Sequence, residues 1–295
     1  MLRNIPVLRA FHALGMYYLW DQSSGFPLPS ALCDLEYDFN AGNFFEVLDN
    51  CPNIHRLFIS TRGENTTTAA CPPRLLSELY SLSLTLITSW EENVEDDFFS
   101  SVLSSLTAPR LTNLALERAY NQEELAQFHT IQSFLTRSSC SLQVLSLNNI
   151  AVTDSGLVTI LKQCVTLEAL HIVDTYPRSS TAEPIITKAF IESLHSSKRS
   201  PIQESPPPIV KSLRSLTLTL ESSEFDAAVF VDMVSSRWIP DPDMAKTIEI
   251  SCLRSVELFL PAQMKVDREA YQPLLPFEKA GMMIVVKQET KGYVF

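Results

Sequence analysis

The stretch Leu142-Gln-Val-Leu145-Ser-Leu147 decides the fold, because close variants of it recur along nearly the whole chain. Leucine occupies its first, fourth and sixth positions. Eight further copies of this pattern, some degenerate, begin at Leu8, Leu32, Ile54, Leu79, Leu111, Leu167, Leu213 and Leu253. One copy has little meaning in a leucine-rich chain, whereas nine copies in order indicate an internal repeat.

Each copy predicts a short strand whose first, fourth and sixth side chains point into the core. The early copies follow one another at about 20–29 residues, which is the spacing of a leucine-rich repeat. The later copies lie further apart and require loop insertions. Because a single repeat cannot bury its own apolar face, the repeats must stack on their neighbours.

Helical patterns separate the copies, so the predicted order alternates strand and helix throughout. In Asp97–Leu106, five apolar residues fall on one face at helical spacing. Other helices are expected after an Asn-led capping box (Asn121 with Glu124), after an N-cap at Thr153 or Asp154, and from Phe225 to Met233.

The predicted fold class is therefore α/β, a leucine-rich-repeat solenoid in a single domain over residues 1–295. Neighbouring strands lie about 4.8 Å apart, whereas a helix with its side chains is about 10 Å thick. A sheet covered on one side by wider helices must curve. We therefore expect parallel strands on the concave face and helices on the convex face.

Residues 196–209 form a Ser/Pro-rich segment that is too polar to pack, which predicts a flexible insertion. Ser200 and Ser205 each precede a proline. The segment is therefore either a plain flexible loop or a target of proline-directed phosphorylation.

Composition argues against two classes of partner. The net charge is -11, whereas a nucleic-acid surface needs clustered Lys and Arg and an anionic membrane surface also selects basic residues. No apolar run is long enough to span a bilayer. Without a signal-peptide core, we expect a cytoplasmic or nuclear protein.

The sequence contains no recognisable motif for catalysis, for a cofactor or for a metal. The seven glycines form neither a dinucleotide fingerprint nor a P-loop, and there is no G-x-S-x-G. No two histidines have the i, i+4 spacing of a helical metal site. The six cysteines form no C-x-x-C pair, which favours buried free thiols. We expect no enzymatic activity, no cofactor and no metal.

The third and fifth residues of each strand are expected on the concave face. Small side chains there allow a partner to approach the sheet, and Arg56 and Phe58 have the chemistry of interface anchors. The candidate partner-binding residues are Arg56, Phe58, Ser83, Asn113, Ser146, His171, Thr217 and Glu257.

Two blocks of sequence resemble a known family. Val152–Leu157, followed by Leu161, Cys164, Leu167 and Leu170, resembles the cysteine-containing leucine-rich repeat of F-box/leucine-rich-repeat proteins, and Cys51 lies before Ile54 as Cys164 lies before Leu167. The irregular repeat lengths are similar to those of fungal F-box-like families with ribonuclease-inhibitor-like repeats. These proteins are substrate receptors of cullin-based ubiquitin ligases, so the resemblance implies a protein or ubiquitination substrate as the partner.

The chain departs from that family at its start. An F-box is a helical segment before the repeats, but here Ile5–Leu8 already forms a repeat junction. Leu28–Leu32 faintly resembles an F-box start, yet Leu32 is needed for a strand. The apolar start is also a poor polar cap for a terminal repeat. We expect either a missing N-terminal F-box domain or a partner that covers this end.

The sequence therefore predicts a non-catalytic protein–protein interaction module that resembles the substrate-recognition repeats of an F-box receptor. The alternative is a free-standing leucine-rich-repeat scaffold or inhibitor unrelated to ubiquitination. An in-frame F-box upstream of Met1 would favour the first interpretation, and turnover of a bound ligand would contradict both.

Overall fold

The computed structural model describes residues 9–13, 32–39, 48–49, 51–61, 73–87, 98–118, 127–174, 185–196, 208–220, 225–264 and 266–288. The chain divides into two compact units, each described by itself. Unit 1 comprises residues 1–122 and 129–141, and unit 2 comprises residues 123–128 and 142–295.

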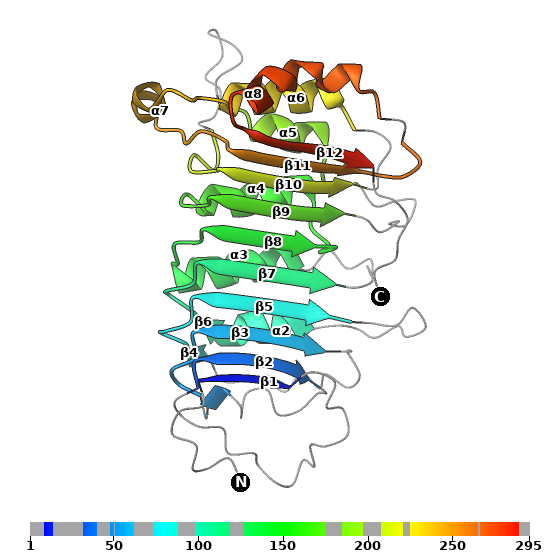
Figure 1. Cartoon of the computed structure of the whole chain (residues 1–295). Coiled ribbons are helices and arrows are strands. Elements are labelled where there is room, and N and C mark those ends of the chain that lie inside the picture. Colours follow the sequence, from blue (N-terminus) through cyan, green and yellow to red (C-terminus); the bar gives the residue numbers. More distant parts are fainter. Residues whose placement is uncertain are drawn as a thin grey trace. The chain divides into compact units, whose positions relative to one another are not determined.

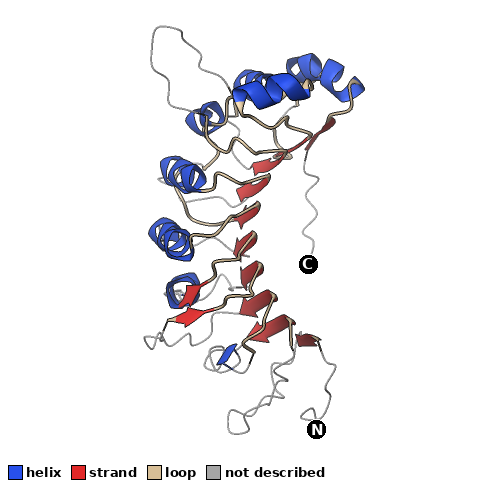
Figure 2. Ribbon diagram, turned by 90° about the vertical axis from the view of Figure 1, so that its left-hand side faces the viewer, coloured by secondary structure: helices blue, strands red, loops and turns tan. Residues whose placement is uncertain are grey.

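Unit 1 is built on parallel strands that neighbour one another in chain order (Figure 1). The helices α2 (Phe98–Ser105) and α3 (Gln127–Ser138) lie on one side of these strands (Figure 2). A second, two-stranded parallel pair joins β4 (Arg74–Leu75) to β6 (Leu106–Thr107). The strands of the main sheet are β1 (Ala10–Ala13), β2 (Asp34–Phe39), β3 (Arg56–Thr61), β5 (Ser81–Leu86) and β7 (Asn113–Arg118).

Unit 2 repeats this arrangement. Its parallel strands, again in chain order, are β8 (Val144–Asn148), β9 (Ala169–Asp174), β10 (Ser215–Leu220), β11 (Ser255–Leu260) and β12 (Met283–Gln288). The helical elements are α4 (Asp154–Gln163), α5 (Lys188–Ser193), α6 (Ala227–Arg237), α7 (Pro242–Ile248), the 3-10 helix η2 (Glu269–Leu274) and α8 (Leu275–Lys279). The helices α4, α5 and α6 lie on one side of the strands (Figure 2). The predicted α/β class with parallel strands is confirmed.

The register of the strands aligns the repeat positions. In unit 1, Leu57 is the register partner of Leu82, and Leu82 is the partner of Leu114. In unit 2, Leu145 pairs with Leu170 in the same way. The predicted inward side chains of β3, β5 and β7 to β11 are all buried, because alternate residues of a strand point to opposite faces of a sheet.

A backbone hydrogen-bond pattern also repeats at the start of each strand. The carbonyl of Cys33 accepts from the N–H groups of both His55 and Arg56, at 2.6 and 3.0 Å. The carbonyl of Gln143 accepts from both Glu168 and Ala169, at 2.8 and 2.9 Å. The same pair of bonds links most neighbouring repeats within each unit, so the turns before the strands are structurally equivalent.

One further position explains the two cysteines of the family-like blocks. In four repeats the residue three places before the first leucine accepts a backbone bond from that leucine, as Cys164 does from Leu167 at 3.1 Å. These four residues are buried, and they are Leu76, Ala108, Cys164 and Val210. Cys51 is buried at the same place before Ile54, whereas Ser139 before Leu142 is exposed. Cysteine therefore serves here as a small apolar side chain, interchangeable in kind with alanine or valine.

The helices begin at short polar caps. The hydroxyl of Thr153 accepts from the N–H of Gly156 at 3.1 Å, which confirms the N-cap expected at Thr153 or Asp154. Thr187 caps α5 and Asp226 caps α6 by the same type of bond. Each cap satisfies one N–H that the helix itself leaves without an acceptor.

Two arginines join the ends of neighbouring helices. Arg137, in the last turn of α3, donates to the carbonyls of Leu103 and Leu106 at 2.5 and 2.7 Å, at the end of α2. Arg237, the last residue of α6, donates to the carbonyl of Leu194 that follows α5. The last carbonyls of a helix receive no hydrogen bond from within the helix. Both arginines supply donors to such carbonyls, and each therefore ties one repeat to the preceding one.

Several expectations need correction or fall outside the described residues. Strand and helix do not alternate throughout, because the described part of the connection between β3 and β5 contains β4 instead of a helix. The strand β12 was not predicted. The expected Asn121–Glu124 cap, residues 197–207 of the insertion, Cys71, Leu28 and the chain before Arg9 lie outside the described residues.

Candidate interaction surface

Each sheet has a face that the described helices do not cover, which we call the open face. It is formed by the third and fifth positions of the repeats, whereas the fourth and sixth positions are buried beneath the helices. Sheets made only of parallel strands are usually covered on both faces. An open face on such a sheet is therefore a surface that a second molecule could cover.

In unit 1 the register places the candidate residues in two adjacent rows. Phe58 lies between Glu36 and Ser83 in one row. Arg56 and Asn113 belong to the other row, with Ser81 between them. All four candidate residues of this unit keep at least partial exposure.

Arg56, a candidate interface anchor, is paired with a carboxylate on the neighbouring strand. Its guanidinium donates two bonds to the Asp34 carboxylate, from Nε at 2.8 Å and from Nη2 at 2.7 Å. This bidentate pairing raises the pKa of Arg56 above its usual value. The Arg56 side chain stays 59% exposed. Its guanidinium is therefore accessible on the open face, but the Asp34 carboxylate balances its charge. Asp34 was missed as a site residue because cross-strand pairing depends on register.

In unit 2 the candidate residues form a single row. Ser146 is the register partner of His171, His171 of Thr217, and Thr217 of Glu257. Half-burial lowers the pKa of His171, and the nearby Glu257 carboxylate opposes that shift. A lowered pKa leaves the imidazole neutral at pH 7. The row therefore offers polar groups with one formal charge, on Glu257.

The neighbouring positions make this part of the surface easy to approach. Ala169, Ser215 and Ser255 occupy the third positions of β9, β10 and β11, and none has a side chain larger than a hydroxymethyl group. At the end of the same row lies Met283 of β12, which is 48% exposed. Small central residues with an exposed apolar side chain at one end suit contact with a protein surface.

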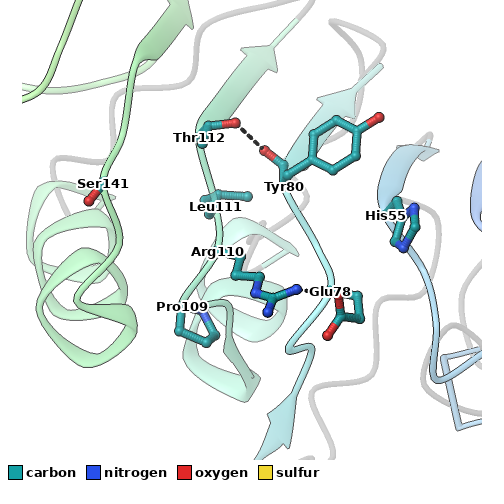
Figure 3. A pocket seen from close by; sticks show the side chains of 8 residues that line it. All are labelled: His55, Glu78, Tyr80, Pro109, Arg110, Leu111, Thr112 and Ser141. Atoms are coloured by element: carbon teal, nitrogen blue, oxygen red, sulfur yellow. Dashed lines mark hydrogen bonds and ion pairs between the residues drawn. The ribbon is translucent and has the colours of Figure 1, made fainter.

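Unit 1 also contains a pocket that sequence reasoning missed (Figure 3). It has a volume of about 560 Å³ and lies where β5 and β7 begin. It is lined by His55, Glu78, Tyr80, Pro109, Arg110, Leu111, Thr112 and Ser141. Most of these residues stand at the second position of a repeat or in the turn before a strand. The sequence predictions concerned only the inward and concave positions of the strands.

The pocket is lined by aromatic rings and by an arginine that is paired with a glutamate. The rings of His55 and Tyr80 lie 6.0 Å apart in a tilted arrangement, and Arg110 Nη1 pairs with Glu78 Oε2 at 2.5 Å. The hydroxyl of Thr112 is engaged with the carbonyl of Tyr80 at 3.1 Å. Aromatic rings beside a paired arginine offer stacking and hydrogen bonding to a ligand.

The described ranges present neither a metal cluster nor a membrane-spanning helix. Within them, no cluster of three or more His, Cys, Asp or Glu side chains is arranged to hold a metal ion. Nor does any helix in that part of the chain have the length and apolarity needed to cross a bilayer. Burial raises the pKa of the Cys51 thiol to about 11, which disfavours the thiolate that metals and electrophiles require.

Comparison with known proteins gave no relative: no family model matches the chain, and no curated protein matches it.

Proposed function

We propose that this chain is a non-catalytic protein-binding module, folded as a leucine-rich-repeat solenoid, whose open faces hold a partner protein. The proposed role is like that of the substrate-recognition repeats of an F-box receptor. Three observations support the repeat architecture: the strands pair at equivalent positions, the same pair of backbone bonds recurs before the strands, and Cys51 and Cys164 stand at equivalent positions.

The observation that carries this proposal is the open face itself. Its rows combine small residues with His171, Thr217 and Glu257 in unit 2, and with Phe58 in unit 1. The opposite face is filled by buried leucines and covered by helices. A protein surface laid on the open face would bury the one side of each sheet that the described helices leave accessible.

The test is quantitative affinity capture from the native cell with matched variants. Thr217→Arg places a long charged side chain on the open face of unit 2, whereas Ala189→Arg places the same side chain on an exposed site of α5. Ser83→Arg and Ser133→Arg form the equivalent pair in unit 1. We expect at least one open-face variant to lose a partner by roughly tenfold or more, as substitutions at interface centres do, and both helix variants to retain it.

Retention of every partner by both open-face variants would contradict the proposal, provided circular dichroism shows that they fold. Ligase subunits among the lost or retained partners would favour the receptor role, and a partner complex without them would favour a free-standing scaffold or inhibitor. Conversion of the captured partner to a product by the purified chain would contradict a non-catalytic role.

A further inference from the structure

The second positions of unit 2 form a row along the edge at which its strands begin. The backbone N–H of Arg214 donates to the carbonyl of Glu168 at 2.8 Å, and that of Arg254 donates to the carbonyl of Arg214 at 2.7 Å. Arg214 and Arg254 are thus direct neighbours on strands about 4.8 Å apart. Both side chains are exposed.

The Arg254 guanidinium lies beside a pair of aromatic rings. Its Cζ lies 5.9 Å from the centre of the Trp238 ring, and the Trp238 ring lies 6.0 Å from that of Phe277 in a tilted arrangement. A cation–π contact attracts the guanidinium to the ring without pairing its charge with a carboxylate. Arg254 therefore keeps N–H donors available at the edge of the sheet.

Several basic residues elsewhere on the described surface are paired with carboxylates. Arg56, Arg74, Arg110 and Lys211 are each paired with a carboxylate within 3.1 Å. Over the described residues, neither Arg214 nor Arg254 forms an ion pair. Glu168 stands beside Arg214 in the row without pairing to it, so the local charge of the three residues is positive in a chain whose net charge is -11.

We propose that Arg214 and Arg254 form a binding site for an oxyanion, a phosphate or a carboxylate group, carried by the partner polypeptide. Two adjacent positive charges repel one another, and an anion between them removes that repulsion while accepting bonds from both forks. Arginine pairs recognise phosphorylated and acidic peptide motifs in this way. That the anion belongs to a partner rests on the proposed function, whereas the site itself does not.

Trp238 supplies a reporter for the site. The chain has three tryptophans, so a Trp20→Phe/Trp90→Phe background leaves Trp238 as the single emitter. Inorganic phosphate and, separately, acetate are titrated at constant ionic strength while Trp238 fluorescence is recorded. We expect a saturable change, because an anion bound to Arg254 alters the cation beside the ring. Tighter binding of phosphate would identify phosphorylated residues as the source, and equal or tighter binding of acetate would identify carboxylates.

Four variants make the result specific. Arg214→Gln should weaken anion binding roughly tenfold, about 1.4 kcal/mol, because the charge-assisted hydrogen bond is lost. Arg254→Gln should abolish the fluorescence change. Glu168→Gln should strengthen binding, a gain that misfolding cannot produce. Arg268→Gln removes one exposed positive charge elsewhere in unit 2 and should leave binding unchanged.

The absence of a saturable change with both anions would overturn the site, as would equal weakening by Arg268→Gln and Arg214→Gln. Failure of the proposed function gives a different result. In that case Thr217→Arg retains every partner, while phosphate or acetate still binds at Arg214 and Arg254.

Discussion

Leu145 and Ser146 are neighbours in β8, but the sheet places them in opposite environments. Leu145 is fully buried and lies in register with the buried Leu170, whereas Ser146 stands on the open face. Leu145→Ala should lower the free energy of unfolding by about 2–5 kcal/mol, because it removes transfer energy and leaves a cavity. Ser146→Ala should change it by less than about 0.5 kcal/mol, as at other surface sites. Urea unfolding measures both, and equal effects would mean that β8 is not oriented as described.

The Cys51 thiol gives a prediction about pH. Burial raises its pKa from 9 to about 11, so folding favours the neutral thiol. The resulting stabilisation is present below about pH 9 and is lost as the pH rises towards 11. Iodoacetamide at pH 8.5 should therefore label Cys51 in the native chain more slowly than the half-buried Cys33, with peptide mass spectrometry as the readout. Faster labelling of Cys51 would contradict its buried place in the turn.

Tyr271 of η2 is a buried residue whose truncation should not lower the free energy of unfolding. Its side chain is 9% exposed, and its hydroxyl finds no hydrogen-bond partner within the described part of the chain. Tyr271→Phe should leave the free energy of unfolding unchanged or raise it, because the mutation removes a buried polar group that is not satisfied. Thr153→Ala, which removes an N-cap bond, should instead cost about 1 kcal/mol. A loss from Tyr271→Phe as large as that from Thr153→Ala would reveal a hydroxyl partner.

At the residue scale, sequence reasoning could predict which side of a strand a residue occupies but not its pairings. Alternation within each copy placed His171 and Thr217 on the open face, and the structure gives both partial exposure. It could not predict the Asp34–Arg56 fork, because that bond depends on the alignment of two strands. The unpaired state of Arg214 and Arg254 depends on three-dimensional neighbours in the same way.

Among the elements, the connection between α5 and α6 depends on Arg237. This side chain is 0% exposed and donates to the carbonyls of Ile209 and Val210, at 2.8 and 3.2 Å, as well as to Leu194. Its pKa is lowered to about 10 by desolvation, so it remains charged at pH 7. Such a residue is a structural link, since it compensates carbonyls that would otherwise be buried without donors.

Arg237→Met should therefore lower the free energy of unfolding by about 2–6 kcal/mol, because it removes the donor from the carbonyls of Leu194 and Ile209 and each buried carbonyl without a donor costs about 1–3 kcal/mol. Arg137→Met removes the analogous link between α3 and α2, but Arg137 is exposed, so its loss should cost less. Urea unfolding of the two variants gives the comparison. A smaller loss at Arg237 than at Arg137 would contradict the role assigned to burial.

The elements that sequence reasoning missed lack the signals on which it relied. The strand β12 follows Gly281, which stands where other copies have a leucine, and so the pattern was not recognised. β4 and β6 are two residues long and too short for any periodicity. α7 has no buried residue, so it has no apolar stripe packed on the core. Strands and helices with a buried face, such as β9 and α4, were predicted because burial imposes a period.

At the scale of the whole molecule, the proposed function rests on an asymmetry that holds in each unit separately. One face of the parallel sheet buries leucines beneath helices, and the other presents small and polar side chains without a described cover. Because the net charge of -11 disfavours nucleic acid, we propose a protein as the partner of this surface. The identity of that partner depends on side-chain pairings that periodicity does not encode, which is why the sequence predicted a surface but no specific ligand.

Cysteine footprinting of the captured complex tests this central claim most directly. Thr217→Cys places a thiol on the open face, and Ala189→Cys places one on the exposed side of α5. Both should react readily with a maleimide in the free chain. We predict that the partner protects Cys at position 217 from labelling and leaves position 189 reactive. Protection at position 189 with full labelling at position 217 would mean that the partner binds the helices, and the open face would not be the binding surface.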